Sequence, residues 1–464
     1  MSNNYQLTRY PIGSIREIWS ISWPLMLSLI SNSIMLFVDR LVLSWHSPES
    51  LAAGANASMS YYLFLVIPMA VCAISEVLVG RLHGEGRFGE IGRPVWQTVW
   101  FALLLAVPMW PLAYFCSDYI FFGSADGYKE KVYFQILMAF APLMCASVAF
   151  GGFFIGIGNV KVVTLCTLIA NVFNVIGAYL FVFGAGFIQP MGVAGAGLAT
   201  GLAQTIQVLL LIGCFLQRSY RQQYGTGRCV FDFGYFKEAI SIGAPAGTGH
   251  VVEIFAHCVF FRILMMAGGP RMAIASLVQS FYLLFGFVVD GLSKSVGAIV
   301  SNLIGGNAFE LIPKVFRSSI LLHTLFSLLY LLGIYFLQDS LLLIFFSGEG
   351  ALLLEDPATL QSAKEAMLWM CLFFLFDGYS WILIGQLTAS GDTKFIFYIS
   401  SILNWFAYVL PVFVLVGLWE RGADAAWMII AFYSILNFCI YFWRYYTGRW
   451  LAKVRSAQGT LVVD

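Results

Sequence analysis

Long apolar runs recur along the chain and alternate with shorter polar segments. A helix needs about 20 apolar residues to cross the hydrocarbon core of a bilayer. Twelve runs reach that length and predict membrane-spanning helices, at residues 19–44, 52–80, 94–116, 131–157, 161–183, 192–216, 236–266, 272–304, 311–337, 361–388, 394–418 and 423–447. The pattern therefore predicts an all-α integral membrane protein.

Among the segments between runs that lie on the same side of the predicted membrane as the two termini, the longest falls almost at the midpoint of the chain. We interpret it as a cytoplasmic linker, because six predicted helices precede it and six follow. The division is an N-lobe at residues 1–216, the linker at residues 217–235, and a C-lobe with a cytoplasmic tail at residues 236–464.

The two halves share weak internal similarity. An offset of 221 residues places Pro24 on Pro245, and an offset of 233 places Asn171 on Asn404. Offsets that differ by one loop insertion indicate a duplicated six-helix unit in which both copies have the same orientation. We therefore expect two six-helix lobes related by pseudo-two-fold symmetry.

Basic residues in the polar segments are distributed unequally between the two sides of the predicted membrane. Seventeen Lys and Arg fall on the side of the termini, against five on the other side. An excess of Lys and Arg marks cytoplasmic loops. We therefore expect a multi-pass protein of the plasma (inner) membrane with both termini in the cytoplasm.

Composition agrees with this class of protein and narrows its chemistry. Hydrophobic residues make up 60% of the chain and charged residues 11%, against about 25% charged in soluble domains. A net charge of +1 gives no reason to expect a nucleic-acid partner. The nine cysteines form no C-x-x-C pair, and no phosphate-binding glycine loop or nucleophile motif is present. We expect neither an enzyme nor a cofactor.

Three acids, Asp39, Glu253 and Asp377, lie inside predicted spans one, seven and ten. An ionisable group at that depth costs several kcal/mol unless it meets water, a partner or a ligand. Helical spacing places Asn32 on the same face as Asp39, and His250 and His257 on the same face as Glu253. The simpler alternative for Glu253 is a neutral carboxyl group bonded to a neighbouring helix. Three acids without as many bases nevertheless predict a cation site.

Other polar residues within the spans have two possible interpretations. Asp290 and Lys294 are four residues apart, acid first, and predict either a structural ion pair or a site that opens when a ligand displaces Lys294. The two histidines could ligate a metal, but two polar side chains lining one cavity is the favoured interpretation, so no metal site is predicted. Asn174 carries an amide suited to bonding across helices or holding an ion.

The order of these motifs resembles the multidrug and toxic compound extrusion (MATE) transporters over essentially the whole chain. The similarity rests on these segments: Pro24 to VDR (38–40), LAAGANAS (51–58), IGIGNVK (155–161), GVAGAGLAT (192–200), GAP (243–245) with Glu253, and FD (376–377) with LTASGDTK (387–394). The resemblance implies two V-arranged lobes, a central cleft open to either side in turn, and export of organic cations in exchange for sodium ions or protons.

By the same resemblance, Asp39, Glu253 and Asp377 correspond to the acids of the first, seventh and tenth helices of the family. One branch adds a fifth-helix acid, and Ala178 stands at that place here. This departure weakens the case for coupling within the N-lobe alone. It makes Glu253 and Asp377 the better candidates for coupling.

The leading hypothesis is a cation-coupled antiporter, driven by sodium ions or protons, that exports organic cations by alternating access as a monomer in the lipid bilayer. The alternative is a flippase of lipid-linked precursors, or a dedicated metabolite exporter, of the same superfamily. A flippase would need basic residues to meet phosphates, and only Lys294 and Arg262 are candidates. A membrane scaffold or receptor would not account for three deep acids.

The predicted orientation can be tested with reporter fusions. Fusions after Gln189 and after Glu355 are expected to report an external position, and a fusion after Tyr224 an internal one. An external signal at Tyr224 would overturn the orientation.

Overall fold

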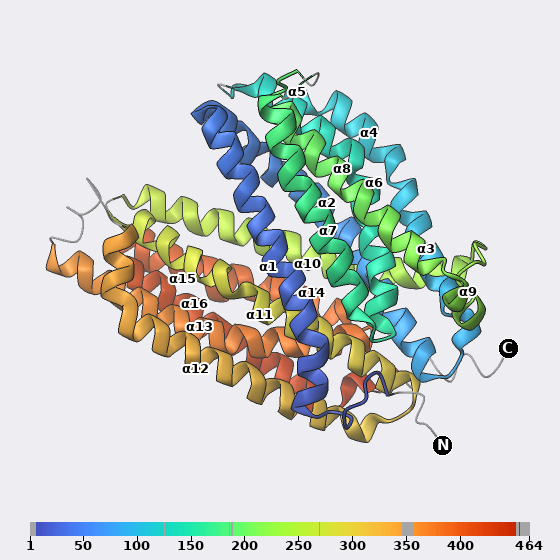
Figure 1. Ribbon diagram of the computed structural model, residues 1–464. Helices are drawn as coiled ribbons and strands as arrows, with labels where there is room; N and C mark the ends of the chain where they lie inside the picture. Colours follow the sequence, from blue (N-terminus) through green and yellow to red (C-terminus); the bar gives the residue numbers. More distant parts are fainter. Residues whose placement is uncertain are drawn as a thin grey trace. The chain divides into compact units, whose positions relative to one another are not determined.

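Every predicted span is occupied by helix in the computed structural model, which describes residues 6–124, 126–184, 186, 189–268, 270–345, 356–451 and 454. Within these residues, twelve helical segments are long and apolar enough to cross a membrane (Figure 1). Ten of them are single helices: α1 (Ile15–His46), α2 (Pro48–Gly84), α6 (Gly127–Gly156), α7 (Val160–Phe183), α8 (Val193–Phe215), α10 (Phe233–Met266), α11 (Arg271–Gly305), α12 (Ile312–Phe345), α13 (Pro357–Ala389) and α16 (Ala423–Tyr446). The chain is therefore a multi-pass membrane protein.

The third span is broken where the sequence predicts one continuous run. It consists of α3 (Gly92–Leu104) and α4 (Ala106–Phe115), and the short α5 (Ser117–Ile120) follows. The break falls at Leu105 because Pro108 has no N–H to donate to the carbonyl of Leu104.

The eleventh span begins as α14 (Thr393–Leu403) and continues as two π-helical segments, Asn404–Val409 and Phe413–Leu418. Between them lies α15 (Leu410–Val412), which contains Pro411. Because Pro411 has no N–H, it cannot donate the hydrogen bond of a regular α-helix, which favours the wider π-helical geometry on either side of it.

Several helices begin earlier than the apolar runs because their first turns are polar. The hydroxyl of Ser47 accepts a hydrogen bond from the Ser50 N–H at 3.1 Å, and Pro48 occupies the first position of α2. Asp356 caps α13 in the same way, with an Asp356 carboxylate oxygen 3.0 Å from the Thr359 nitrogen. Both are standard N-terminal signals that a count of apolar residues omits.

The chain folds into two compact units. The first contains Met1–Arg9, Ser20–Gly247 and Ala298–Phe309, and the second contains Tyr10–Trp19, Thr248–Gly297 and Glu310–Asp464. The first unit therefore includes the beginning of α10 and the end of α11. The division into lobes at residues 217–235 stays a prediction, and the fusion point Glu355 and most of the C-terminal tail lie outside the described residues.

In the first unit, α2, α6, α8 and α7 pack in succession (Figure 1). Their interior is rich in rings, with Phe134, Phe150, Phe153 and Phe215 almost fully buried. Pairs such as Phe153 and Phe215 meet edge to face, with ring centroids 4.9 Å apart, which adds to the stabilisation from apolar burial.

The linker between predicted spans six and seven contains a short helix, α9 (Arg218–Tyr224). Gly225 ends it with a φ of 63°, a backbone conformation that glycine adopts without strain. Buried Tyr224 packs against Phe153 with centroids 5.7 Å apart. The polar segment is thus an ordered part of the first unit.

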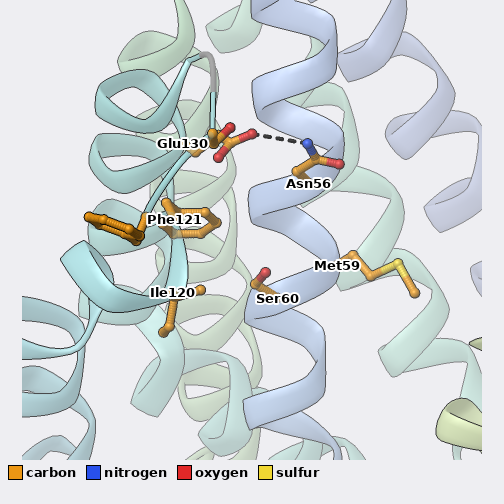
Figure 2. A pocket seen from close by; sticks show the side chains of 8 residues that line it. Asn56, Met59, Ser60, Ile120, Phe121 and Glu130 are labelled. Carbon is orange, nitrogen blue, oxygen red and sulfur yellow. Dashed lines mark hydrogen bonds between the residues drawn. The ribbon is translucent and has the colours of Figure 1, made fainter.

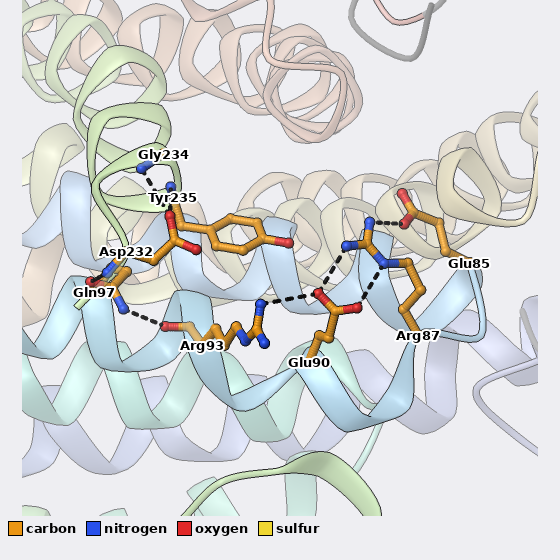
Figure 3. Close-up of polar contacts among 8 residues, drawn as sticks. All are labelled: Glu85, Arg87, Glu90, Arg93, Gln97, Asp232, Gly234 and Tyr235. Carbon is orange, nitrogen blue, oxygen red and sulfur yellow. Dashed lines mark hydrogen bonds and ion pairs between the residues drawn. The ribbon is translucent and has the colours of Figure 1, made fainter. Parts of the chain in front are cut away.

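Gln97 of α3 fixes the segment between the linker and α10 (Figure 3). Its amide donates to the Val230 carbonyl at 2.8 Å and accepts from the Asp232 N–H at 2.9 Å. Asp232 in turn accepts a hydrogen bond from the N–H of Gly234 at 2.9 Å. These bonds set the point at which α10 enters the unit.

The ion pairs of Arg87 with Glu85 and Glu90 lie near the surface and contribute little stability.

The end of α11 packs directly on the end of α2 in the first unit. A Cβ atom at Gly84 would overlap the Asn302 carbonyl oxygen, and one at Gly305 would overlap the Arg81 carbonyl oxygen. His83 and Asn302 are joined by a 3.2 Å hydrogen bond across the same contact. The helices approach this closely because glycine has no side chain at either point.

The second unit is centred on α13, which packs against α12 and α16. Phe374, Tyr408, Trp427 and Tyr441 are among its largest fully buried side chains.

One buried ion pair ties the loop after α13 to α16 in the second unit. The Arg444 Nε donates to Asp392 at 2.8 Å, and the side chain of Asp392 is 2% exposed. The Arg444 guanidinium also lies 4.6 Å from the centre of the Phe395 ring. The pair therefore fixes the LTASGDTK turn.

We expect Gly84→Ala and Gly305→Ala each to destabilise the protein by about 1–3 kcal/mol, because the added methyl group has no room. Thermal unfolding in detergent measures the effect. Gly286→Ala on α11 is the matched control, since a Cβ atom there has no neighbour within 4 Å. Equal melting temperatures for all three variants would contradict the close contact.

Candidate functional site

Asp39 is the buried acid of the first unit, 4% exposed. The Thr200 hydroxyl of α8 lies 3.3 Å from Asp39 Oδ2, and the Asn174 amide of α7 donates to Thr200 Oγ1 at 3.2 Å. The remaining oxygens, Asp39 Oδ1 and Asn174 Oδ1, are buried without a hydrogen-bond partner. We call these three residues the Asp39 cluster. Its free oxygens are acceptors of the kind that coordinate small hard cations.

The polar face predicted for α1 lies against α7. The Asn171 amide donates to Ser31 Oγ at 2.7 Å and to Asn32 Oδ1 at 3.0 Å. Asn32 therefore joins α1 to the helix that carries Asn174. Arg40 is exposed, so its charge is not enclosed with that of Asp39.

Asp377 is the buried acid of the second unit, 7% exposed, and Tyr282 of α11 is its partner. The Tyr282 hydroxyl donates to Asp377 Oδ2 at 2.8 Å. The Tyr282 ring packs 5.0 Å from that of Phe373, which fixes the direction of the hydroxyl group. Asp377 is thus held by a neutral donor within apolar surroundings.

Glu253 and His250 lie in contact on one turn of α10, and the contact is an ion pair when the imidazole is protonated. His250 Nδ1 lies 3.4 Å from Glu253 Oε2, and both side chains keep more than a third of their surface accessible. The His250 ring stacks on Trp381 of α13 with centroids 5.2 Å apart and planes 17° apart. Because Trp381 lies one turn after Asp377, this stacking aligns α10 with the helix of Asp377. Asp377, Tyr282, Glu253, His250 and Trp381 are the Asp377 cluster below.

His257 has a different role from His250. Its Nδ1 lies 3.2 Å from the backbone carbonyl of Glu253, and its ring meets Tyr408 edge-on at 5.5 Å. Within the described residues, no three His, Cys, Asp or Glu side chains gather as metal ligands.

The predicted ion pair between Asp290 and Lys294 is not formed. Both residues are exposed, and no described ion pair joins them. Four-residue spacing brings two such side chains within reach, but an exposed pair gains only a few tenths of a kcal/mol and does not impose one geometry. The structure therefore corrects the expectation of a structural ion pair, while a ligand-binding role for either residue stays a prediction.

Sequence reasoning missed the neutral donors of both clusters. Thr200 ends the motif GVAGAGLAT, and Tyr282 lies in the apolar run of α11. A hydroxyl group inside an apolar helix was the available signal, since such groups find partners when buried. Spacing within one helix does not reveal which neighbouring helix supplies that partner.

Comparison with known proteins gives one family. The family model MatE matches residues 24–180 and 245–413. The chain is 22% identical to the "Probable multidrug resistance protein NorM" of Neisseria meningitidis serogroup B, over 90% of each chain. It is 20% identical to the "Uncharacterized transporter YisQ" of Bacillus subtilis, over 90% of this chain and 93% of that one.

Solved structures share the fold at lower identity. A MOP superfamily transporter from Pyrococcus furiosus superposes with a TM-score of 0.84 at 16% identity, over 96% of this chain and 98% of that chain. An outward-facing multidrug resistance MATE family transporter superposes with a TM-score of 0.83 at 14% identity, over 98% and 99%.

We expect the effects of Asp290→Asn and Lys294→Gln on stability to be small and additive, with a coupling energy below about 0.5 kcal/mol, because the exposed groups do not bond. Thermal unfolding of both single variants and the double variant gives the coupling. A value near 3 kcal/mol would restore the buried pair.

Proposed function

Since the chain belongs to the MatE family, we propose that it is a cation-coupled antiporter that exports organic cations by alternating access. The coupling ion is a sodium ion or a proton. The proposal goes further than family membership, because it assigns the driving ion and the residues that bind it.

The observation that carries the proposal is the environment of two acids. Asp39 and Asp377 are both more than nine-tenths buried in membrane-spanning helices. Among the described ion pairs, none includes either residue. A carboxyl group in such surroundings is stable when it carries a proton or holds a cation, and costly when it is ionised and empty. Each acid therefore requires the kind of ligand that a coupled exporter exchanges.

The two clusters differ in a way that suggests a division of roles. Glu253 is more accessible than either aspartate and lies 3.4 Å from His250, which is a counter-charge for it when protonated. An organic cation that displaces His250 would meet a carboxylate beside the Trp381 ring, a combination that favours flat cations. The Asp377 cluster is thus proposed as the site where coupling ion and substrate compete.

Competition of this kind is sufficient to couple the two fluxes. A ligand shifts a conformational equilibrium only by its difference in affinity between the two states. If coupling ion and substrate exclude one another, each favours the passage of the other in the opposite direction. The name of the Neisseria relative, a probable multidrug resistance protein, supports a multidrug substrate range for this chain.

The setting of the transporter follows from the loop charges. We place it in the plasma (inner) membrane with both termini in the cytoplasm, acting as a monomer. The flippase alternative would depend on Arg262 and Lys294 alone, two exposed bases without a described ion-pair partner.

We expect ion-driven efflux of a fluorescent cation from proteoliposomes to fall at least about tenfold in Glu253→Gln and Asp377→Asn, because both variants keep shape but lose the exchangeable charge. Substrate binding without a gradient should persist in part. Asp39→Asn should have the milder effect, since Ala178 replaces the additional acid of the first unit.

Asp118→Asn is the matched control, because Asp118 is a surface acid 66% exposed in its side chain. Separate sodium and pH gradients identify the coupling ion. Full efflux by the Glu253→Gln, Asp377→Asn double variant would refute the mechanism. Loss of efflux in Asp39→Asn alone would move coupling to the first unit.

A further inference from the structure

A cavity of about 360 Å³ lies in the first unit between α2 and the segment that joins α5 to α6. Figure 2 shows Asn56 and Ser60 of α2 facing Glu130, Phe121 and Ile120 across it. None of these residues belongs to the Asp39 cluster. The volume is within the range of pockets that bind small organic molecules.

The charged group of this cavity is Glu130, the fourth residue of α6. Glu130 is 2% exposed, and its Oε1 accepts a hydrogen bond from the Asn56 amide at 2.9 Å. A neutral amide orients the carboxylate but does not cancel its charge. An enclosed carboxylate without a counter-charge is costly, so a bound cation would stabilise it.

The nearest lysines in sequence do not supply that counter-charge. Lys129 pairs with Asp126 at 3.2 Å, and Lys131 pairs with Asp118 at 2.6 Å. No described ion pair includes Glu130. The cavity therefore keeps one negative charge that the neighbouring bases leave uncompensated.

The remaining wall combines the hydroxyl groups of Ser60 and Ser124 with the apolar side chains of Met59, Ile120, Phe121 and Phe122. One of its two aromatic rings has a fixed position. The Phe121 ring, 9% exposed, packs edge to face on Phe134 with centroids 5.5 Å apart. The next residue, Phe122, also lines the cavity and is 89% exposed, so it lies at the rim. An aromatic ring and a carboxylate together recognise a cation that carries apolar groups better than a hydrated metal ion, which needs several oxygen ligands.

We propose that this cavity is a binding site for a small organic cation, of the quaternary or aromatic ammonium class, with Glu130 as its counter-charge. The site is additional to the Asp39 and Asp377 clusters. Its occupation is an equilibrium property, so it holds whether or not those clusters couple transport to an ion gradient.

Photolabelling of the full-length protein in nanodiscs of neutral lipid tests the site directly. The probe is (4-azidobenzyl)trimethylammonium, and mass spectrometry maps the labelled peptides. We expect labelling within residues 56–60 or 120–122, suppressed by excess benzyltrimethylammonium. Neopentylbenzene, the neutral isostere, should not compete, because it lacks the charge that Glu130 attracts.

Two variants test the chemistry in different ways. Glu130→Gln keeps an oxygen for Asn56 but removes the charge, and Ser60→Leu fills the cavity while leaving Glu130 in place. Both should reduce labelling of these residues by at least about tenfold, since a contact with a charged group is lost or blocked. The control, Glu49→Gln, removes an exposed acid from the same helix α2 and should label as the parent does.

Gel-filtration profiles and melting temperatures show whether each variant is folded. Labelling at Asp39, Glu253 or Asp377 is expected to persist in Glu130→Gln, and this internal reference separates the cavity from the central clusters. The proposal is overturned if residues 56–60 and 120–122 remain unlabelled in the parent protein, if neopentylbenzene competes equally, or if a folded Glu130→Gln labels there as strongly as Glu49→Gln.

Discussion

The cost of enclosing a carboxyl group in the apolar interior of a membrane protein constrains this structure more than any other interaction. Asp39 and Asp377 are both almost fully buried, and the hydrogen bond described for each carboxylate comes from a hydroxyl group. Hydroxyl donors orient a carboxylate but leave its charge in place, and removing that charge from water costs several kcal/mol. The packing of apolar side chains does not offset this cost. We therefore propose that an exchangeable cation offsets it.

The helices around the acids are fixed by contacts that hold these groups in position. Tyr282 is oriented by its packing on Phe373, and the stacking of His250 on Trp381 links α10 to α13. Two spans depart from regular α-helical geometry: the third is broken at Leu105, and the eleventh contains the two π-helical segments. Asn404 begins a π-helix and has both amide atoms buried without a described partner, and Tyr408 of the same segment packs against His257. Irregular backbone of this kind is tolerated in a membrane protein where side chains line polar space.

The sequence was sufficient for the spans and for the acids but not for their partners. Apolar length predicted most helix ends to within a few residues, because every span must cross the same hydrocarbon thickness. The exception is α12, which continues to Phe345 although the apolar run predicted an end at residue 337. The third span breaks at Leu105 because of Pro108, a visible signal that the apolar count ignored. Thr200 and Tyr282 could not be paired with Asp39 and Asp377, since hydrogen bonds between helices depend on packing that periodicity does not encode. Asp290 and Lys294 had the spacing of an ion pair on a helix. Spacing tells whether two side chains can touch, but not whether they are buried or paired.

The central claim is that a buried carboxyl group in this protein exchanges a bound cation for an organic substrate. The most direct measurement is ion release on substrate binding, followed with pH and sodium electrodes in weakly buffered solution without any membrane gradient. The account predicts that binding releases protons or sodium ions in proportion to the substrate bound, and that Glu253→Gln with Asp377→Asn abolishes the release. Substrate binding by the unaltered protein without release of either ion would contradict it.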